Sequence, residues 1–199
     1  EVIKLITMSL KELVNFIIMK KLILILLFIP LVSFGQNDFR KMFWGESKEV
    51  LKEKYPDAEF GPSKEAGIEM LTHFDNVLGL PASVSYMFQD NKLMGGAYIF
   101  NALAYGDSDD RLKDFNSVSV RLNDKYEMER NDTWYKDTWK DRPNYLGYAI
   151  GMGDVSLSEL GVKGDNVAIA HTLTKDNHIL GFLLEDGLKS MDKSMDDDI

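Results

Sequence analysis

The chain has 199 residues, a formal net charge of −9 and no cysteine. An acidic chain repels phosphate backbones, so nucleic acid is not an expected partner. The absence of cysteine excludes disulfides, a thiol nucleophile and a thiolate metal site. Apolar residues make up 45% of the chain, so it must hold its fold by packing.

Met19–Gln36 has the features of a bacterial export signal. Lys20 and Lys21 form a positive start, an apolar run follows over 22–34, and cleavage is expected after Gly35. The apolar run is shorter than the roughly 20 residues that span a bilayer. We therefore predict a periplasmic or secreted protein with no membrane span after signal cleavage.

The first residues are interpreted separately from the export signal. The chain opens with Glu1, whereas Met19 stands directly before the lysine pair. We interpret residues 1–18 as over-extended translation, the alternative being a genuine extension that starts at Met8. The rest of the chain then divides into a signal peptide, one α+β domain and an acidic tail expected to be disordered, at 19–35, 36–189 and 190–199.

Two amphipathic helices are predicted. The first begins at Ser47, a favourable N-cap, and is stopped by Pro56. The second is capped by Ser108. Its apolar positions recur at helical spacing, at Leu112, Phe115, Val118, Leu122 and Tyr126.

Alternating polarity predicts a set of strands, at 67–75, 82–89, 93–101, 145–152, 155–160, 166–173 and 179–184. In the clearest of them the core-facing residues are Ala82, Val84, Tyr86 and Phe88. Asn76–Pro81 is predicted to be a loop, and Asp90-Asn91-Lys92 and Lys175-Asp176-Asn177 are predicted hairpin turns. The pair Gly95-Gly96 indicates a bulge or a close backbone approach.

The two turns lie in similar sequences, which indicates an internal repeat. Gln89–Gly95 and Lys175–Gly181 both read x-Asp-Asn-x-apolar-apolar-Gly, at an offset of 86 residues. We predict an α+β fold of two helix-plus-antiparallel-meander (αβββ) units, at 39–101 and 107–187, with helices packed on one side of an antiparallel sheet. The alternative is a chance match between common turns, and the α+β class does not depend on duplication.

The opening Phe39-Arg40-Lys41-x-x-Trp44-Gly45-x-Ser47 resembles that of uncharacterised exported bacterial proteins. More distantly, Gly45–Val50 resembles the Gly-x-Ser-x-x-Val helix opening of the SmpA/BamE-like outer-membrane assembly components. The β-lactamase inhibitor proteins are similar in having exported αβ repeats. Tyr55-Pro56-Asp57 stands where the SmpA/BamE-like pattern has Gly-x-Pro. The resemblance implies an αβ-repeat fold and a binding role.

No catalytic residue, cofactor or metal site is predicted. The three histidines, His73, His171 and His178, have no metal-binding spacing, although His171 and His178 would approach each other if the hairpins pack as repeats. The glycine-rich run 147–153 is interpreted as a bulge and turn, because a phosphate loop needs a strand before it and a helix after it.

An aromatic group is the best candidate for a binding surface. It consists of Trp134, Tyr135, Trp139, Tyr145 and Tyr148. Tryptophan and tyrosine are favoured at interface hot spots and offer flat faces to sugars. The alternative is that a tryptophan closes the end of the sheet against the second helix.

These observations favour a non-catalytic module that binds an envelope protein or glycan. The alternative is a small periplasmic hydrolase that acts on envelope glycans or peptides through carboxylates, which are too numerous to single out. The sequence leaves the partner and the oligomeric state open.

Overall fold

A computed structural model describes residues 38–65, 67–100, 107–164 and 166–186. Its elements in chain order are α2 (Lys48–Lys54), β1 (Gly61–Glu65), β2 (Ile68–Val77), β3 (Leu80–Gln89), β4 (Lys92–Phe100), α3 (Ser108–Asn123), β5 (Met128–Arg130), β6 (Thr133–Trp134), the 3-10 turns η2 (Asp137–Trp139) and η3 (Pro143–Tyr145), α4 (Leu146–Met152), β7 (Val155–Lys163), β8 (Val167–Leu173) and β9 (His178–Leu184). The predicted signal peptide and the predicted tail 190–199 lie outside the described residues, as does 101–106.

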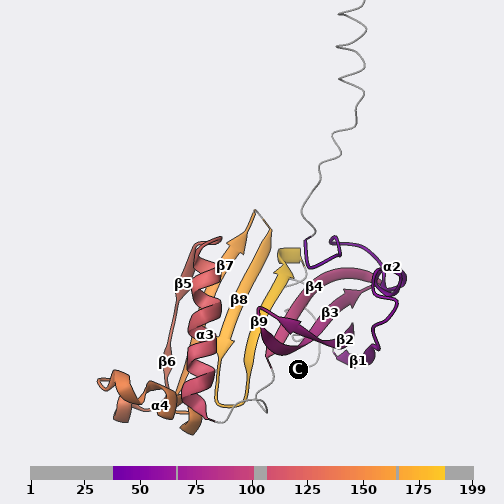
Figure 1. Cartoon of the computed structure of the whole chain (residues 1–199). Helices are drawn as coiled ribbons and strands as arrows, with labels where there is room; N and C mark the ends of the chain where they lie inside the picture. Colours follow the sequence, from indigo (N-terminus) through magenta and orange to yellow (C-terminus); the bar gives the residue numbers. More distant parts are fainter. Residues whose placement is uncertain (1–37, 66, 101–106, 165, 187–199) are drawn as a thin grey trace, which may run out of the picture. The chain divides into compact units, whose positions relative to one another are not determined.

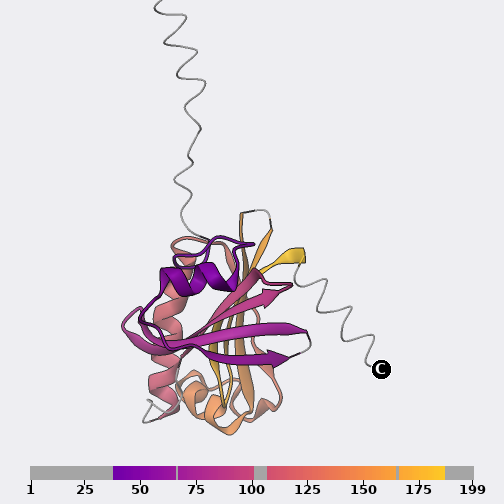
Figure 2. The same cartoon turned by 90° about the vertical axis from the view of Figure 1, so that its right-hand side faces the viewer.

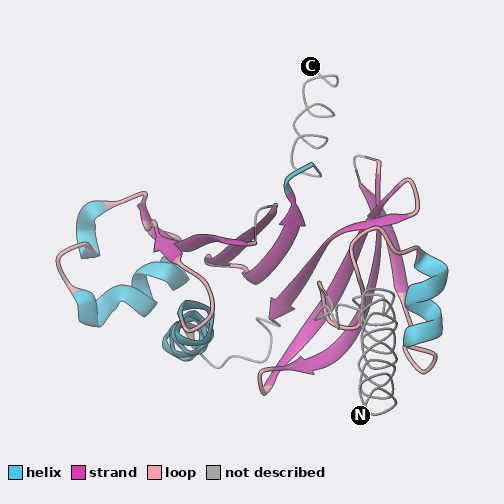
Figure 3. Ribbon diagram, turned by 90° about the horizontal axis from the view of Figure 1, so that it is seen from above, coloured by secondary structure: helices cyan, strands magenta, loops and turns pink. Residues whose placement is uncertain are grey.

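The strands form one antiparallel sheet, which confirms the α+β class. Its order is β1-β2-β3-β4-β9-β8-β7-β5, and β6 pairs with the start of β7. Helix α3 runs along β7, β8 and β9, and α2 lies beside β3 and β4 (Figures 1 and 2). Seen from above, α3 and α4 lie together at the β7 end of the sheet and α2 lies at the other end (Figure 3).

The helices bury their apolar residues against one face of the sheet, which we call the core face. Leu51 of α2 and Val118 of α3 belong to the same buried cluster as Tyr86 and Ile169. A second cluster joins Phe115 of α3 and Ile150 of α4 to strand residues, at Val155, Leu157 and Leu173.

The segment before α2 contributes directly to this core. Phe39 and Met42 are fully buried and face each other across a tight turn in which Arg40 has a left-handed φ of 56°. A Cβ at Gly96 of β4 would overlap the Phe39 ring. The glycine therefore allows the close approach that the sequence indicated, and the conspicuous opening Phe39-Arg40-Lys41 has a packing role.

The first turn of the sheet differs from the prediction. Asn76–Pro81 was predicted to be a loop, but β2 continues to Val77 and β3 starts at Leu80. Leu78 and Gly79 form a two-residue turn with φ of 58° and 88°. Two-residue hairpin turns of this kind favour the pair Asn-Gly. Because leucine stands at the first position here, the sequence does not show the usual pattern for such a turn. The predicted turn at Asp90 and Asn91, with φ of 51° and 61°, is confirmed.

Helix α3 is found where the periodicity predicts it. Phe115, Val118 and Leu122 are buried. The N-cap is Asp107 rather than Ser108, because the Asp107 carboxylate accepts a hydrogen bond from the Asp110 backbone N–H at 2.9 Å.

The predicted strand at 145–152 is wrong, because Leu146–Met152 is helix α4. Two of its glycines pack against the start of α3. A Cβ would overlap the Asp109 carboxylate at Gly147 and the Ser108 hydroxyl at Gly151. Only Gly153, at φ 74°, is the turn glycine that the sequence suggested; it ends the helix in the left-handed conformation.

We expect Gly96→Ala to destabilise the protein by about 1–3 kcal/mol, because the new methyl group must displace the buried Phe39 ring. The measurement is the free energy of unfolding in urea. Gly61→Ala is the matched control, because its Cβ would meet only the Thr72 carbonyl oxygen at 3.9 Å. Equal stability of the two variants would show that Phe39 does not need this glycine.

Candidate functional site: an exposed aromatic cluster beside a buried histidine network

The segment between α3 and β7 carries all five aromatic residues of the predicted surface, and the structure brings three of them together. Trp139 and Tyr145 stack with centroids 5.1 Å apart and an interplanar angle of 24°. Tyr148 meets Trp139 edge-on at 5.3 Å. The Arg142 guanidinium lies 5.5 Å from the centroid of the Trp139 ring. We call Trp139, Tyr145, Tyr148 and Arg142 the aromatic cluster.

Helix α4 explains how the cluster is displayed. Ala149 and Ile150 face the core, so Tyr148 and Met152, four residues apart, point away from it. Tyr145, Tyr148 and Met152 are 49%, 52% and 53% exposed. Trp139 is half-buried and packs against the core. The cluster is therefore an anchored tryptophan with two exposed tyrosines beside it.

The other two predicted residues lie outside the stack. Trp134 is half-buried and packs against the second core cluster. This corresponds to the alternative in which a tryptophan closes the sheet against the second helix. Tyr135 is 67% exposed, and its hydroxyl lies 3.3 Å from the Ser156 hydroxyl.

A second constellation lies within the core, and the sequence indicated only part of it. Glu159, His171 and His178 are almost fully buried, with exposures of 4%, 0% and 0%. His171 Nδ1 lies 2.9 Å from Glu159 Oε2, and His171 Nε2 lies 2.9 Å from His178 Nε2. Ser119 of α3 donates to the same Glu159 oxygen at 2.7 Å. The expected approach of the two histidines is thus found, on one face of adjacent strands.

The donors of this histidine network follow from its geometry. An ionised carboxylate only accepts, so His171 donates through Nδ1–H to Glu159. The Nε2 of a neutral His171 then accepts, and His178 must donate through Nε2–H. His178 Nδ1 is consequently an acceptor, and it has no hydrogen-bond partner among the described residues.

The surroundings of the network keep both imidazoles neutral. Burial lowers the pKa of His171, although Glu159 opposes the shift. Burial, with His171 and Arg111 adding to it, lowers the pKa of His178 to about 3. The Phe115 ring stacks on His171 at 4.1 Å and the Phe100 ring lies 4.4 Å from His178. Neutral, stacked imidazoles favour structural support over proton transfer to a substrate.

The network does not have the geometry of a nucleophilic triad. In such a triad the imidazole takes the proton of the serine hydroxyl, whereas Ser119 here donates to the carboxylate. The four side chains are buried, so none is open to a substrate. Among the described residues there is also no group of three metal-ligating side chains.

The third histidine also has a packing environment. His73 is buried on the core face and stacks on Tyr86 with an interplanar angle of 13°. Burial, followed by the nearby Arg40, lowers its pKa. Burial also raises the pKa of the neighbouring Tyr98 to about 12. All three histidines are thus expected to be neutral in the folded protein at neutral pH.

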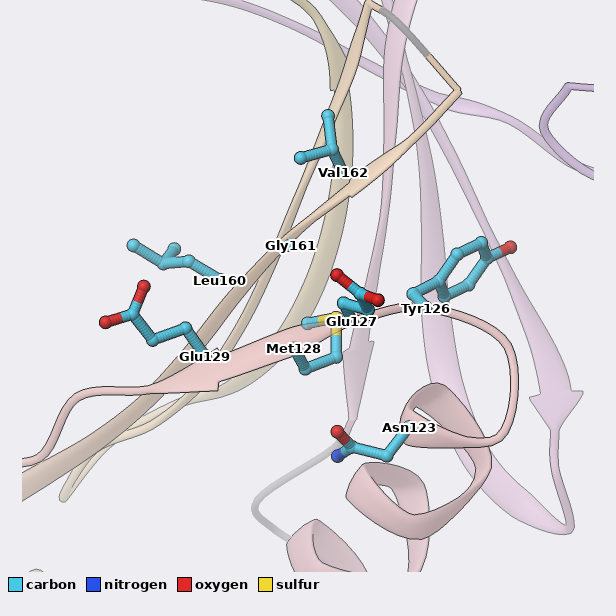
Figure 4. A pocket seen from close by; sticks show the side chains of 8 residues that line it. All are labelled: Asn123, Tyr126, Glu127, Met128, Glu129, Leu160, Gly161 and Val162. Atoms are coloured by element: carbon cyan, nitrogen blue, oxygen red, sulfur yellow. The ribbon is translucent and has the colours of Figure 1, made fainter.

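Open pockets lie at the two edges of the sheet. The one beside β5 has a volume of about 690 Å³, and Figure 4 shows Leu160 and Glu129 pointing away from Asn123 of α3. The one beside β2 has about 640 Å³ and includes Asp57, Glu59 and Phe74. Glu49 and Asp75, two described carboxyl groups whose pKa is displaced, lie outside both pockets, and both shifts are downward. Neither group has the raised pKa that is expected of the general acid of a hydrolase.

Comparisons with protein-family models, curated proteins and solved structures found no match for this chain. No helix among the described residues is long and apolar enough to cross a membrane. The site must therefore be interpreted from its own geometry.

Sequence reasoning missed Glu159 and Ser119. The available signal was the alternation of residues along the strand. Val155, Leu157 and Glu159 point to the same side of β7, which places a carboxylate at a core-facing position. A buried carboxylate requires donors, and histidines on the adjoining strand were the natural candidates. The helical spacing of Leu146, Ala149 and Ile150 was the corresponding signal for α4.

We expect the free energy of unfolding to fall as pH drops below about 6.5. The histidines of the unfolded chain then bind protons, whereas the buried histidines of the folded protein stay neutral. Stability is fully present above that pH. The stability lost through His178 alone reaches about 2 kcal/mol at about pH 5, since its folded pKa is about 3. Urea unfolding at about pH 5 and at a pH above about 6.5 measures this loss of stability.

His178→Gln is the matched variant, because its amide N–H₂ can still donate to His171 but does not titrate. It should remove about 2 kcal/mol of the pH-dependent loss, whatever its stability at neutral pH. An unchanged pH dependence would mean that His178 is not held neutral. The folded protein lowers the carboxyl pKa values of Asp75 and Glu49, so their contribution to stability is lost mainly as the pH falls below their unfolded values of about 4 and adds little to the loss at about pH 5.

Proposed function

We propose that the protein is an exported, non-catalytic binding module whose contact surface is the aromatic cluster. The observation that carries this proposal is the display of Tyr145 and Tyr148, each about half exposed, around the anchored Trp139. Exposed aromatic rings held by a rigid support lose little conformational entropy on binding, which is why they dominate interface hot spots. Export rests on the signal-like segment Met19–Gln36.

A protein partner fits the cluster better than a glycan. Sugar stacking needs an open aromatic plane, whereas the Trp139 ring already contacts Tyr145, Tyr148 and Arg142. The tyrosines instead offer ring edges and hydroxyl groups, and Arg142 adds a planar donor. This mixture is typical of the centre of a protein interface.

The strand order supports the two-unit αβββ arrangement as part of this proposal. One unit consists of α2 with β2, β3 and β4, and the other of α3 with β7, β8 and β9. The last strands, β4 and β9, pair at the centre of the sheet, and each half repeats the same strand sequence outward from them. Helix α4 and the aromatic cluster lie in an insertion peculiar to the second unit, as expected of a functional addition to a repeated scaffold.

Hydrolysis is less well supported than binding. The carboxylate–histidine pair that the described residues build into the core, Glu159 with His171, is closed off from solvent. The glutamates of the pocket beside β5 are on an exposed edge strand, which gives them the ordinary environment of surface acids.

We expect the double variant Tyr145→Ala/Tyr148→Ala to lose at least about tenfold in affinity for the partner while keeping its thermal stability, because both rings are half exposed. The partner is obtained by affinity capture from envelope extract, identified by mass spectrometry and then titrated against each variant. Tyr135→Ala is the control, since Tyr135 is more exposed than either tyrosine of the cluster but lies outside it.

Two results would contradict the proposal. One is an undiminished affinity of the double variant for a stoichiometric partner. The other is the absence of any retained partner when the bait is shown to be folded. A loss of stability in the double variant would assign the two tyrosines to the core instead.

A further inference from the structure

The face of the sheet opposite the core face, which we call the outer face, has an unusual composition. The strand registers of β2, β3, β4, β9, β8 and β7 align its residues in three cross-strand rows of six. The rows are Met70–Met87–Gly95–Leu183–Ala168–Val162, Thr72–Ser85–Ala97–Gly181–Ala170–Leu160 and Phe74–Ser83–Ile99–Ile179–Thr172–Ser158. None of the eighteen residues is charged or a histidine.

This absence of charge is unexpected for a solvated sheet face. Charged residues make up 28% of the chain, so about five of the eighteen positions would carry one if position had no effect. An antiparallel sheet with one face in water normally alternates apolar and polar residues. The outer face instead alternates apolar residues with small uncharged ones.

No described helix covers the outer face. Its larger apolar residues belong to neither buried cluster, and the buried apolar residues of α2, α3 and α4 pack on the core face. Phe74, Val162 and Leu160, at its two ends, are 78%, 60% and 52% exposed. A contiguous apolar face of this kind marks a site of association.

We propose that the outer face packs against the outer face of a second copy of this chain. The charge distribution favours self-association over a basic partner. A chain of net charge −9 would attract a basic partner through carboxylates on the contact face, and the eighteen positions have none. Glu129 of β5 lies on this face only at its edge, where it pairs with Leu160. Two acidic copies, in contrast, can meet only where neither has to bury a charge against its like.

The area is sufficient for a dimer. Eighteen positions spaced about 4.8 Å between strands and about 6.8 Å along them cover about 590 Å². Two such areas total about 1,200 Å², the lower end of the range for specific interfaces. Ser85 and Ala97 in the middle row are only 5% exposed in the single chain, so the larger residues around them supply most of the area that association would bury. Apart from Leu160 at its edge, the middle row consists of small residues, among them Gly181 and Ala170, so the two sheets can approach closely.

The acidic residues nearest to the outer face lie at the sheet edges. Asp57 and Glu59 line the pocket that contains Phe74, and Glu127 and Glu129 line the pocket that contains Leu160. At a dimer rim these carboxylates remain solvated and repel one another weakly. Salt screens that repulsion, so the dimer should tighten as ionic strength rises.

Sedimentation equilibrium of the purified protein at up to about 100 µM tests the proposal, since it detects dissociation constants in the micromolar range. Ala170→Glu and Ala170→Lys place opposite charges at one exposed position in the middle row of the outer face. Each should weaken the dimer at least about a hundredfold, because both bury an unpaired charge in it. Val120→Glu, on the exposed side of α3, should leave it unchanged.

A monomeric wild-type protein would overturn the proposal, as would a dimer that tolerates both outer-face charges. Opposite effects of Ala170→Glu and Ala170→Lys would also overturn it, because they would reflect net charge rather than burial. Circular dichroism establishes that each variant folds. The double variant Tyr145→Ala/Tyr148→Ala should remain dimeric, which separates a failure here from a failure of the aromatic contact surface.

Discussion

The pairing of β4 with β9 is the constraint on which the rest of the structure depends. These strands come from distant parts of the chain, and their register sets Gly96 opposite Phe182 and Phe100 opposite His178. The first pairing leaves room beneath Gly96 for Phe39, so the segment before α2 can complete the core of the first half. The second places an aromatic ring beside His178 and closes the apolar wall around the histidine network. One ladder of hydrogen bonds thus joins two helix-and-sheet halves into a single packed layer.

The histidine network shows how a polar group can be accommodated at that junction. A buried carboxylate is costly unless donors surround it, and Glu159 receives them from α3 and β8. The donor Ser119 ties the helix to the sheet, and the His171–His178 contact ties β8 to β9. Arg111 adds a further tie, because its guanidinium donates to the Thr174 carbonyl oxygen at the β8–β9 turn. The polar network therefore specifies how α3 sits on the sheet, a role that apolar contacts alone would leave less defined.

The two faces of the sheet differ in whether helices cover them and in the charged residues that they carry. The core face is covered by helices and contains the buried histidines and Glu159, whereas the outer face carries no charge from β2 to β7 and is covered by no described helix. The aromatic cluster lies with the helices, on an insertion that the sheet does not need for its own pairing. We propose that the outer face serves association and the aromatic cluster serves recognition, so the two proposed contact surfaces lie on different parts of the fold.

Local sequence determined the elements whose signals are local. Alternation located β3 and β8, the Asp-Asn pairs located two turns, and helical spacing located α3, because backbone preference and amphipathic period are carried by neighbouring residues. Tertiary structure decided the rest. Residues 146–152 form a helix whose Gly147 and Gly151 allow a close approach to the start of α3, and that approach depends on residues distant in the chain. The partners of Glu159 lie 12 and 40 residues away along the chain. The alternating pattern of the strand could therefore indicate that Glu159 is buried, but not which side chains donate hydrogen bonds to it. Which aromatic residues are core and which are surface was likewise settled by packing, since Trp134 and Tyr148 differ in the neighbours that the fold brings to them.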